Sequence, residues 1–454
     1  MKSPDGGLAA ASLKPIASKH TQFKRNDNDM PAHPDLVAQN AQFAKKIHRL
    51  SDSVYTAVGY AASNVHFLVG DKGIVLIDTT ETTQAAENIL TDFREISDLP
   101  VTTIIYTHSH RDHISGATVF AEGRDVEVIA ADNFTSDLVG VDESRPAPNK
   151  ALMSRTKRHF GISLRPDERI SVGVGPGDRP MKGMGAGYIE PTKRVSDTTL
   201  ITREGFELEL AKAPGETPDH VVVWLASQKI LFSGDNFYHA FPNLYAIRGT
   251  PYRDFDAWAD TMDQLMAYAP EILAPGHTQP VIGAAAIREA LTDYRDAIRH
   301  VVAKTVEGMN AGLDPVTIAA DLKLPDHLAS KPYLQEFYGD VGYASRAYFA
   351  GTLGWFDGNP SSLGELPPKD EAVKIIALAG GAGAVLSAAE SALSSGDAQW
   401  AMELADRLIF ADQHKVEASQ IKIKALREVA DLTVNAPTRN YYLLAARELE
   451  ETLE

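Results

Sequence analysis

Short apolar runs and amphipathic segments alternate through the first half of the chain. Runs rich in Val, Ile and Leu are typical of buried strands, and they occur at residues 54–58, 65–69, 74–77 and 101–106. Gly70-Asp71-Lys72-Gly73 predicts a hairpin turn between the second and third of these runs. Apolar residues recur at helical spacing over residues 34–50 and 83–96, so we expect a helix in each segment.

A second set of strand-like runs comes later, at residues 199–202, 206–211, 220–225 and 229–232. An amphipathic helix is predicted over Phe255 to Tyr268, before a last apolar strand that ends near Leu273. Between the two sets, residues 149–160 show a basic helical pattern, and residues 173–187 contain six glycines and two prolines. We expect the glycine-rich segment to form a long irregular loop. The order of strands and helices predicts an α/β sandwich built from two halves.

Helical patterns replace strands in the last part of the chain. Residues 284–309 form one long amphipathic segment, and paired helical segments follow Pro368. They resemble a helix-hairpin array of the tetratricopeptide type, although no strict repeat period is visible, and such arrays serve packing or dimerisation. We therefore predict a polar leader over residues 1–33, a catalytic domain over 34–283 and a helical dimerisation domain over 284–454.

Composition and charge narrow the classes of partner. The 454 residues are 44% hydrophobic and 23% charged, as in ordinary soluble globular proteins, and the net charge is −17. An acidic surface does not attract polyanions, so we expect no nucleic-acid partner. No apolar run approaches transmembrane length, and the patch from Leu8 to Leu13 is too short for a signal peptide. We expect no membrane insertion and a cytoplasmic location.

The densest candidate chemistry lies directly after the strand at residues 101–106. His108, His110, Asp112 and His113 stand within six residues there. The carboxyl ends of strands are where open α/β sheets usually place their functional loops. Imidazole and carboxylate are the ligands that Zn²⁺, Mn²⁺ and iron prefer. Because the chain has no cysteine, His, Asp and Glu must supply all metal ligands.

Four further polar turns follow apolar runs. Ala213 to His220 precedes one strand, Asp235 ends another, and the sequence Pro275-Gly276-His277 ends a third. Asp78 directly follows the run at residues 74–77. For Asp78, three roles stay open: a helix cap, a hydrogen-bond partner of the histidine loop, or a simple polar residue.

These motifs resemble the metallo-β-lactamase superfamily, and within it the alkylsulfatase branch. The His-x-His-x-Asp-His loop is specific to the superfamily. Three other features are similar to the branch: Pro214-Gly215-Glu216, the segment from Asn243 to Gly249, and Leu353 to Pro360 ahead of the helical array. The resemblance implies an αβ/βα sandwich followed by an all-α dimerisation domain, and hence a homodimer.

The same resemblance implies a binuclear zinc site, although Mn or Fe also suit such ligands. His108, His110 and Glu216 would bind one ion, Asp112, His113 and His277 the other, and Asp235 would bridge them. The resemblance also implies a catalytic role for Asp112. Asn243 and Arg248 would bind the sulfate group of a small sulfate ester, which a metal-activated water would hydrolyse.

The sequence departs from the branch in three ways. Asp235 stands where the branch has glutamate. Tyr343 occupies the place of a histidine associated with the leaving group, so we assign Tyr343 a catalytic role in assisting it. A sterol-carrier-like C-terminal domain is not found. Two other functions are therefore considered: hydrolysis of a phosphodiester, phosphonate or lactone on the same metals, or a metal-binding dimeric scaffold with little turnover.

Overall fold

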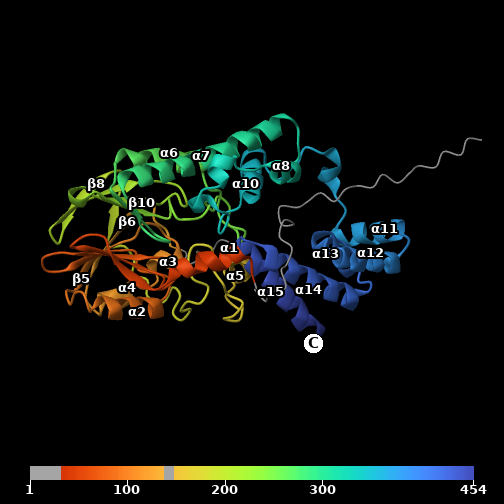
Figure 1. Cartoon of the computed structure of the whole chain (residues 1–454), viewed down its shortest axis with the longest axis horizontal. Coiled ribbons are helices and arrows are strands. Elements are labelled where there is room, and N and C mark those ends of the chain that lie inside the picture. Colours follow the sequence, from red (N-terminus) through yellow and green to blue (C-terminus); the bar gives the residue numbers. More distant parts are fainter. Residues whose placement is uncertain (1–31, 137–147) are drawn as a thin grey trace, which may run out of the picture.

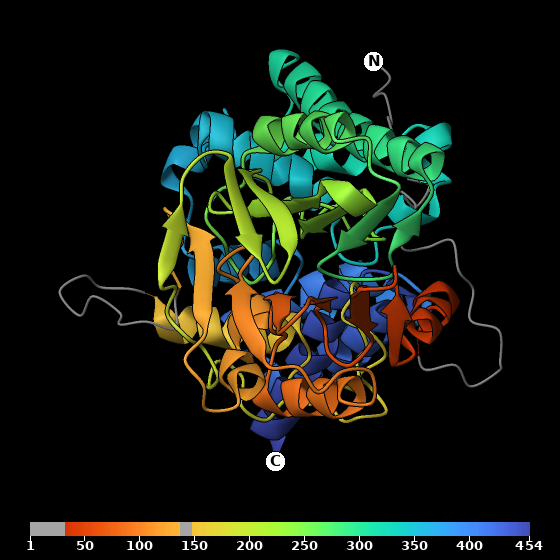
Figure 2. The same cartoon turned by 90° about the vertical axis from the view of Figure 1, so that its left-hand side faces the viewer.

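The computed structural model describes residues 32–136 and 148–454. The predicted leader at residues 1–33 therefore lies almost entirely outside the described residues. Thirteen strands in the described part form two sheets. Figure 2 shows the sheets facing each other, with helices on the two outer sides. This arrangement is the predicted α/β sandwich.

The first sheet has seven strands in sequence order, antiparallel from β1 to β4 and parallel from β4 to β7. Its side chains alternate between two environments, because successive residues of a strand point to opposite faces. In β4, Val75 and Ile77 face the other sheet, whereas Ile74 and Leu76 face the outer helices. The strands are β1 (Lys46–Arg49), β2 (Val54–Val58), β3 (Val65–Val69), β4 (Ile74–Ile77), β5 (Val101–Ile105), β6 (Glu127–Ala131) and β7 (Lys193–Val195).

The second sheet has six strands, and only β11 and β12 run parallel. Leu208, Val223 and Phe232 of this sheet are buried against Val75 and Ile105 of the first, so apolar packing holds the two sheets together. The strands are β8 (Thr199–Arg203), β9 (Phe206–Lys212), β10 (Val221–Leu225), β11 (Ile230–Gly234), β12 (Ile272–Pro275) and β13 (Val281–Ile282).

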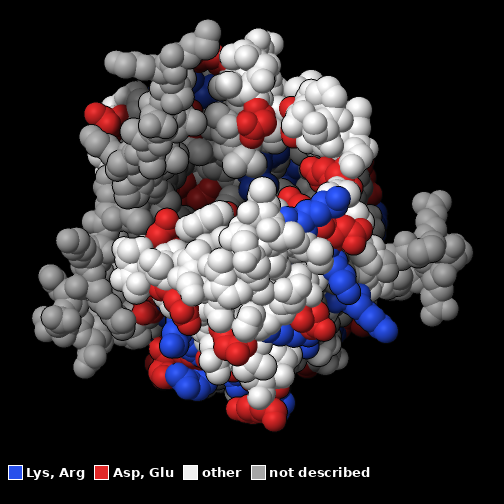
Figure 3. All heavy atoms as spheres, turned by 90° about the vertical axis from the view of Figure 1, so that its right-hand side faces the viewer, with Lys and Arg blue, Asp and Glu red and all other residues white. Residues whose placement is uncertain are grey.

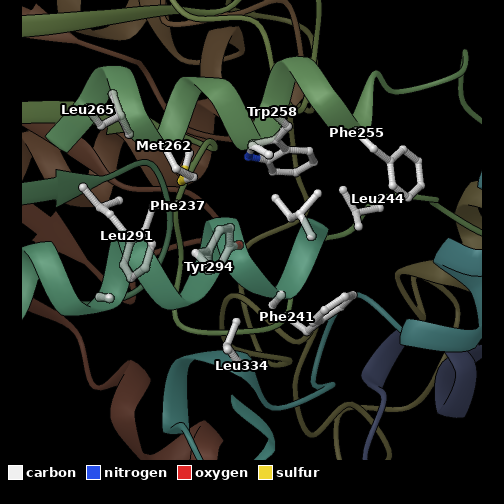
Figure 4. Close-up of a cluster of buried hydrophobic side chains, with 14 of the residues drawn as sticks. Phe237, Phe241, Leu244, Phe255, Trp258, Met262, Leu265, Leu291, Tyr294 and Leu334 are labelled. Atoms are coloured by element: carbon white, nitrogen blue, oxygen red, sulfur yellow. The ribbon is translucent and has the colours of Figure 1, made fainter. Parts of the chain in front are cut away.

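Helices cover both outer faces of the sandwich. On the first sheet lie α2 (Thr83–Phe93), α3 (Arg111–Ile114) and α4 (Ala117–Ala121), and Thr82 caps α2 by accepting the backbone N–H of Ala85. On the second sheet lie α6 (Phe255–Ala267) and α7 (Ala284–Asn310). Figure 4 shows Trp258 and Met262 of α6 pointing toward Leu291 and Tyr294 of α7. The domain boundary at residue 284 stays a prediction, since α7 packs against a sandwich helix.

The helical part has an apolar core of its own, formed mainly by α11 to α15. The last helix returns to the sandwich side and packs against α5 (Figure 1). Arg158 of α5 forms a bidentate ion pair with Glu448 of α15, which joins the two parts. The helices are α1 (Pro34–Asn40), α5 (Asn149–His159), α8 (Pro315–Asp321), α9 (Asp326–Ala329), α10 (Val341–Leu353), α11 (Pro368–Leu378), α12 (Ala382–Ser394), α13 (Ala398–Phe410), α14 (Lys415–Leu432) and α15 (Ala436–Leu453).

One secondary-structure prediction is wrong in part. The helix expected over residues 34–50 ends early, as α1 and a 3-10 turn at Ala41–Phe43, and residues 46–49 form β1. These residues pair antiparallel with β2, so tertiary pairing at the sheet edge overrides the weak helical pattern. Among the described residues, no single helix is long and apolar enough to span a membrane, and α11 with α12 reaches that length only as a pair bent by 91°.

Candidate metal centre

Loops from both sheets converge at one end of the sandwich. The histidine loop follows β5, Asp235 follows β11, and His277 lies two residues beyond the end of β12. Glu216 lies in the turn between β9 and β10. The carboxyl ends of the parallel strand pairs therefore bring together ligands that are far apart in the sequence.

The candidate ligands form two groups. In the first, His108 Nε2 lies 3.0 Å from His110 Nδ1 and 3.6 Å from Asp235 Oδ2. In the second, Asp112 Oδ2 lies 3.5 Å from His113 Nε2 and 3.4 Å from His277 Nε2. Each group brings one nitrogen or oxygen atom per residue within 4.8 Å of the others, which is close enough to bind one ion.

Asp235 connects the two groups. Its Oδ1 lies 3.3 Å from His113 Nε2, and its Oδ2 lies between His108 and His277, 3.1 Å from His277 Nε2. A Cβ atom on Gly276 would come within 2.5 Å of Asp235 Oδ1, so glycine at this turn leaves room for the carboxylate. The geometry is that of a carboxylate able to bridge two ions.

Asp78 fixes the orientation of ligands in both groups. Its Oδ2 accepts the Nδ1–H of His113 at 2.8 Å and the hydroxyl of Thr107 at 2.8 Å. The same hydroxyl oxygen lies 3.0 Å from His108 Nδ1 and accepts its proton. Both imidazoles therefore carry the proton on Nδ1 and turn Nε2 toward the candidate metal positions. Of the three roles left open for Asp78, the structure favours hydrogen bonding to the histidine loop.

A buried chain of contacts orients His277 in the same way. Its Nδ1–H donates to the carbonyl of Ala62 at 2.6 Å, and the amide of Ala62 donates to Glu81 Oε2 at 3.0 Å. Arg179, from the glycine-rich loop, donates to the same carboxylate at 2.8 Å, and its side chain is 1% exposed. The predicted irregular loop thus supports a ligand of the second group.

The two groups differ in charge. Burial lowers the pKa of His108 well below its usual range, and burial with the charges of Arg248 and Arg253 lowers the pKa of His110 to about 3. Burial alone would also lower the pKa of His277, but the carboxylates of Asp235 and Asp112 raise it to about 10. The first pair is neutral and ready to bind metal, and the second group attracts positive charge, which a divalent cation can supply in place of a proton.

Two buried atoms support a cation in this centre. His113 Nε2 and Asp235 Oδ1 face each other at 3.3 Å, and neither atom forms a hydrogen bond with the residues that the structure describes. Buried nitrogen and carboxylate atoms are rarely left without partners, and both are metal-ligand types. The chemistry of the donor set therefore fits two divalent ions.

Glu216 lies beside the first group. Its Oε1 is 3.8 Å from His110 Nδ1, but it also accepts Arg253 Nη1 at 2.8 Å, and its Oε2 accepts the hydroxyl of Tyr238 at 3.2 Å. Burial raises the pKa of Glu216 to about 7, against the lowering effect of Arg253. The structure thus brings Glu216 near the first group and gives it an arginine partner that sequence reasoning missed.

The predicted anion-binding residues lie next to this arginine. Asn243 is 2% exposed, and its Nδ2 has no hydrogen-bond partner among the described residues. Its carbonyl accepts Arg253 Nη1 at 2.5 Å. Arg248 is close enough to lower the pKa of His110 and to be influenced by Glu216 and Asp112. Two guanidinium groups and a free amide therefore face the ligand groups, which suits an anion.

Known families match this chain along most of its length. A profile described as the metallo-beta-lactamase superfamily matches residues 58–277, and one described as alkyl sulfatase dimerisation matches residues 314–452. A linear primary-alkylsulfatase of Pseudomonas sp. is 36% identical over 389 residues, which are 84% of this chain and 73% of that relative. The chain belongs to the alkylsulfatase family. The predicted family and fold class are confirmed.

Other alkylsulfatases match more weakly over a similar length. An alkyl/aryl-sulfatase of Saccharomyces cerevisiae is 30% identical over 416 residues, covering 89% of this chain and 64% of the relative. The solved structure of the stereoselective inverting sec-alkylsulfatase Pisa1 from Pseudomonas sp. aligns with a TM-score of 0.83 and 29% identity, over 94% of this chain and 70% of that chain. Membership of the family makes the chain a metal-dependent hydrolase.

Tyr343 lies on the helix that follows Tyr338 and Gly339, where the family motif has its histidine. It is on α10, and its hydroxyl lies 3.1 Å from Thr438 Oγ1 of the last helix. Tyr338, five residues earlier, lies near the alkylsulfatase centre: its ring centroid is 5.7 Å from that of Tyr238, which bonds to Glu216, and burial and the charges of Glu216 and Asp112 raise the pKa of Tyr338. The catalytic role of Tyr343 stays a prediction without a described contact to the ligand groups.

Proposed function

We propose that this alkylsulfatase-family chain is a binuclear zinc hydrolase of alkyl sulfate esters. The observation that carries the proposal is a pair of ligand groups joined by Asp235, with Arg248 and Arg253 beside them. When bound there, two Zn²⁺ ions would supply Lewis acidity and lower the pKa of a bound water to about 7. The sequence-predicted ligands account for six coordinating side chains in these groups, with Glu216 adjacent.

The protein's own residues bind and orient the ester. Arg248 supplies charge-assisted hydrogen bonds to the sulfate oxygens, and the free Nδ2 of Asn243 supplies another donor. Arg253 pairs with Glu216 and holds it next to His110, and its charge opposes the rise in the pKa of Glu216 that burial causes. Burial of these groups excludes water, so each electrostatic contact with the anion is stronger than it would be at the surface.

A turnover screen with metal analysis tests the proposal. Primary alkyl sulfates of short and long chain, secondary alkyl sulfates and phosphodiesters are offered to one sample whose metal content is measured. The matching relatives include primary and secondary alkylsulfatases, so the screen determines which alcohol part the substrate carries. We expect about two zinc ions per chain and turnover of sulfate esters that a chelator abolishes. Fewer than one ion per chain, or turnover confined to phosphodiesters, contradicts the proposal.

Replacing Arg248 by alanine tests the anion site. A hydrogen bond to a charged group contributes about 1.5–3 kcal/mol, so kcat/KM for a sulfate ester should fall about 10- to 100-fold, mostly through a higher KM. Arg248→Lys keeps the charge but loses the planar fork and should be intermediate. Arg299→Ala, at an exposed position on α7, is the control. Unchanged KM in Arg248→Ala shows that the anion binds elsewhere.

We also propose that the helical part joins two copies of the chain. The dimerisation profile covers residues 314–452, and Leu363, Val373 and Leu378 expose apolar side chains there, Leu378 by 90%. Figure 3 shows this end of the molecule, where uncharged residues cover a broad area. Light scattering should give about twice the chain mass of 49.2 kDa.

The double variant Leu363→Asp and Leu378→Asp should shift this mass to that of one chain, because buried carboxylates at an interface are unfavourable. Leu200→Asp, at an exposed apolar position of β8 in the sandwich, is the matched control and should stay dimeric. A dimer that persists in the double variant contradicts this assignment of the surface.

A further inference from the structure

Helix α5 is attached to the segment that carries Arg248. The guanidinium of Arg155 donates to the carbonyl of Ile247 at 2.8 Å. A Cβ atom on Gly249 would lie 3.1 Å from Leu152 Cδ2, so the helix and the segment are in close contact. Two successive turns of α5 therefore hold the residues on both sides of Arg248 in place. The last residue of this helix is His159.

His159 is buried beside the arginines without a partner for its ring. The residue is 1% exposed, and neither Nδ1 nor Nε2 has a hydrogen-bond partner among the residues that the structure describes. Its ring centroid lies 6.0 Å from that of Tyr338, one of the tyrosines near the metal centre. Its backbone carbonyl accepts the side-chain amide of Asn440, which fixes the end of the helix.

A buried imidazole without partners is unfavourable unless something else satisfies it. Burial, and then the charges of Arg248 and Arg253, lower the pKa of His159 well below its usual range. The ring is therefore neutral, with one N–H donor and one acceptor nitrogen. Positive neighbours exclude a cation at this place, and they attract an anion that can accept the N–H.

We propose that His159 is a further substrate-contacting residue, which donates its ring N–H to the anionic group held by Arg248. That the anion is a sulfate group follows from the function proposed above. The contact of His159 with an anion is inferred from the position of α5. The family motif assigns a histidine near the leaving group to the helix α10, where this chain has Tyr343. The structure places a buried histidine at the end of α5, the helix that contacts the segment carrying Arg248.

The experiment compares His159→Met and His159→Gln with the wild-type, zinc-loaded protein. Met is apolar and of similar size, whereas Gln retains a donor. Inhibition by inorganic sulfate is measured alongside kcat and KM for an alkyl sulfate. We expect His159→Met to raise both the inhibition constant of sulfate and KM about tenfold, with a smaller change in kcat, and His159→Gln to restore part of this loss. His327→Gln, at an exposed position of α9, is the matched control.

A second measurement uses the wild-type protein alone. Ring proton signals of the histidines are recorded by NMR during titration with inorganic sulfate, and the signal missing from His159→Gln identifies His159. The proposal requires this signal to shift on saturation with sulfate. An unmoved signal, or inhibition constants within twofold of wild type in both variants, overturns it. Absence of sulfate-ester turnover in the wild type refutes the proposed function instead, and the sulfate titration still decides the contact.

Discussion

Replacing Asp235 by asparagine should lower kcat/KM for a sulfate ester by at least about 10³-fold, because metal-based stabilisation of the transition state is worth several kcal/mol. Asp235 reaches both ligand groups: its carboxylate lies 3.6 Å from His108 of the first group and 3.1 Å from His277 of the second. An amide of the same size presents one oxygen and an N–H group, so it cannot bridge two cations. The metal content should fall from about two ions to one or fewer per chain.

Two controls accompany the Asp235→Asn variant. Asp235→Glu keeps the charge that the alkylsulfatase motif carries at this place and should retain part of the activity and both ions. The second control is the thermal midpoint of the metal-free proteins. Because asparagine has nearly the same volume as aspartate, this midpoint should stay close to that of the wild type, and a lost metal is then not due to a lost fold. His220 accepts the backbone N–H of residue 235, a contact that the change leaves intact. An asparagine variant with two ions and ordinary turnover rules out the bridging role.

The strands of the sandwich were predictable because both of its sheets are buried. In β4 and β10 every residue is apolar and faces either the other sheet or a helix, which gives dense runs of aliphatic residues. The edge strand β1 lacks this signal, since Lys46 and Arg49 are exposed and only pairing with β2 defines it. The local pattern of apolar residues therefore identifies central strands, and it misses edge strands that form only by pairing with a neighbouring strand.

The site was predictable only where ligands cluster in sequence. His108, His110, Asp112 and His113 share one loop, and their spacing alone indicated a metal. Glu216, Asp235 and His277 came from resemblance to a family, because each lies in a separate turn that only the folded sheets bring together.

Arg253, Tyr338 and His159 were not predicted as site residues. Each lies in or close to a segment that the sequence analysis named, but their proximity to the ligands depends on the packing of α5 and two loops. Burial of an arginine or of an unpartnered imidazole is a property of the fold, so it cannot be read from the residue type.

The second large effect is expected at Asp78, which binds no metal itself. Replacement by asparagine should lower metal affinity and turnover about 10²- to 10³-fold. Loss of the hydrogen-bond partner of one metal ligand lowers affinity about 10- to 100-fold, and Asp78 orients one ligand in each group. The backbone should tolerate the change, because residue 78 has φ of 59° and asparagine adopts this left-handed conformation readily.

The physical cause is the direction of two hydrogen bonds. Asp78 Oδ2 accepts both the hydroxyl of Thr107 and the Nδ1–H of His113. An amide nitrogen at that position donates instead, which drives the proton of His113 to Nε2 and removes the lone pair that would bind the second ion. The backbone N–H of Thr107 can still donate to the remaining oxygen, as it does to Oδ1 now.

Thr107→Val separates the two branches of this network. It removes the link to His108 but leaves the pair of Asp78 and His113, so metal loss should be confined to the first group. Titration of the metal-free variants with zinc, followed by calorimetry, should therefore show one weakened site in Thr107→Val and two in Asp78→Asn. Equal affinities in Asp78→Asn and wild type would mean that metal binding alone sets the tautomers. The hydrogen bonds of Asp78 would then be a consequence of the fold with no influence on the centre.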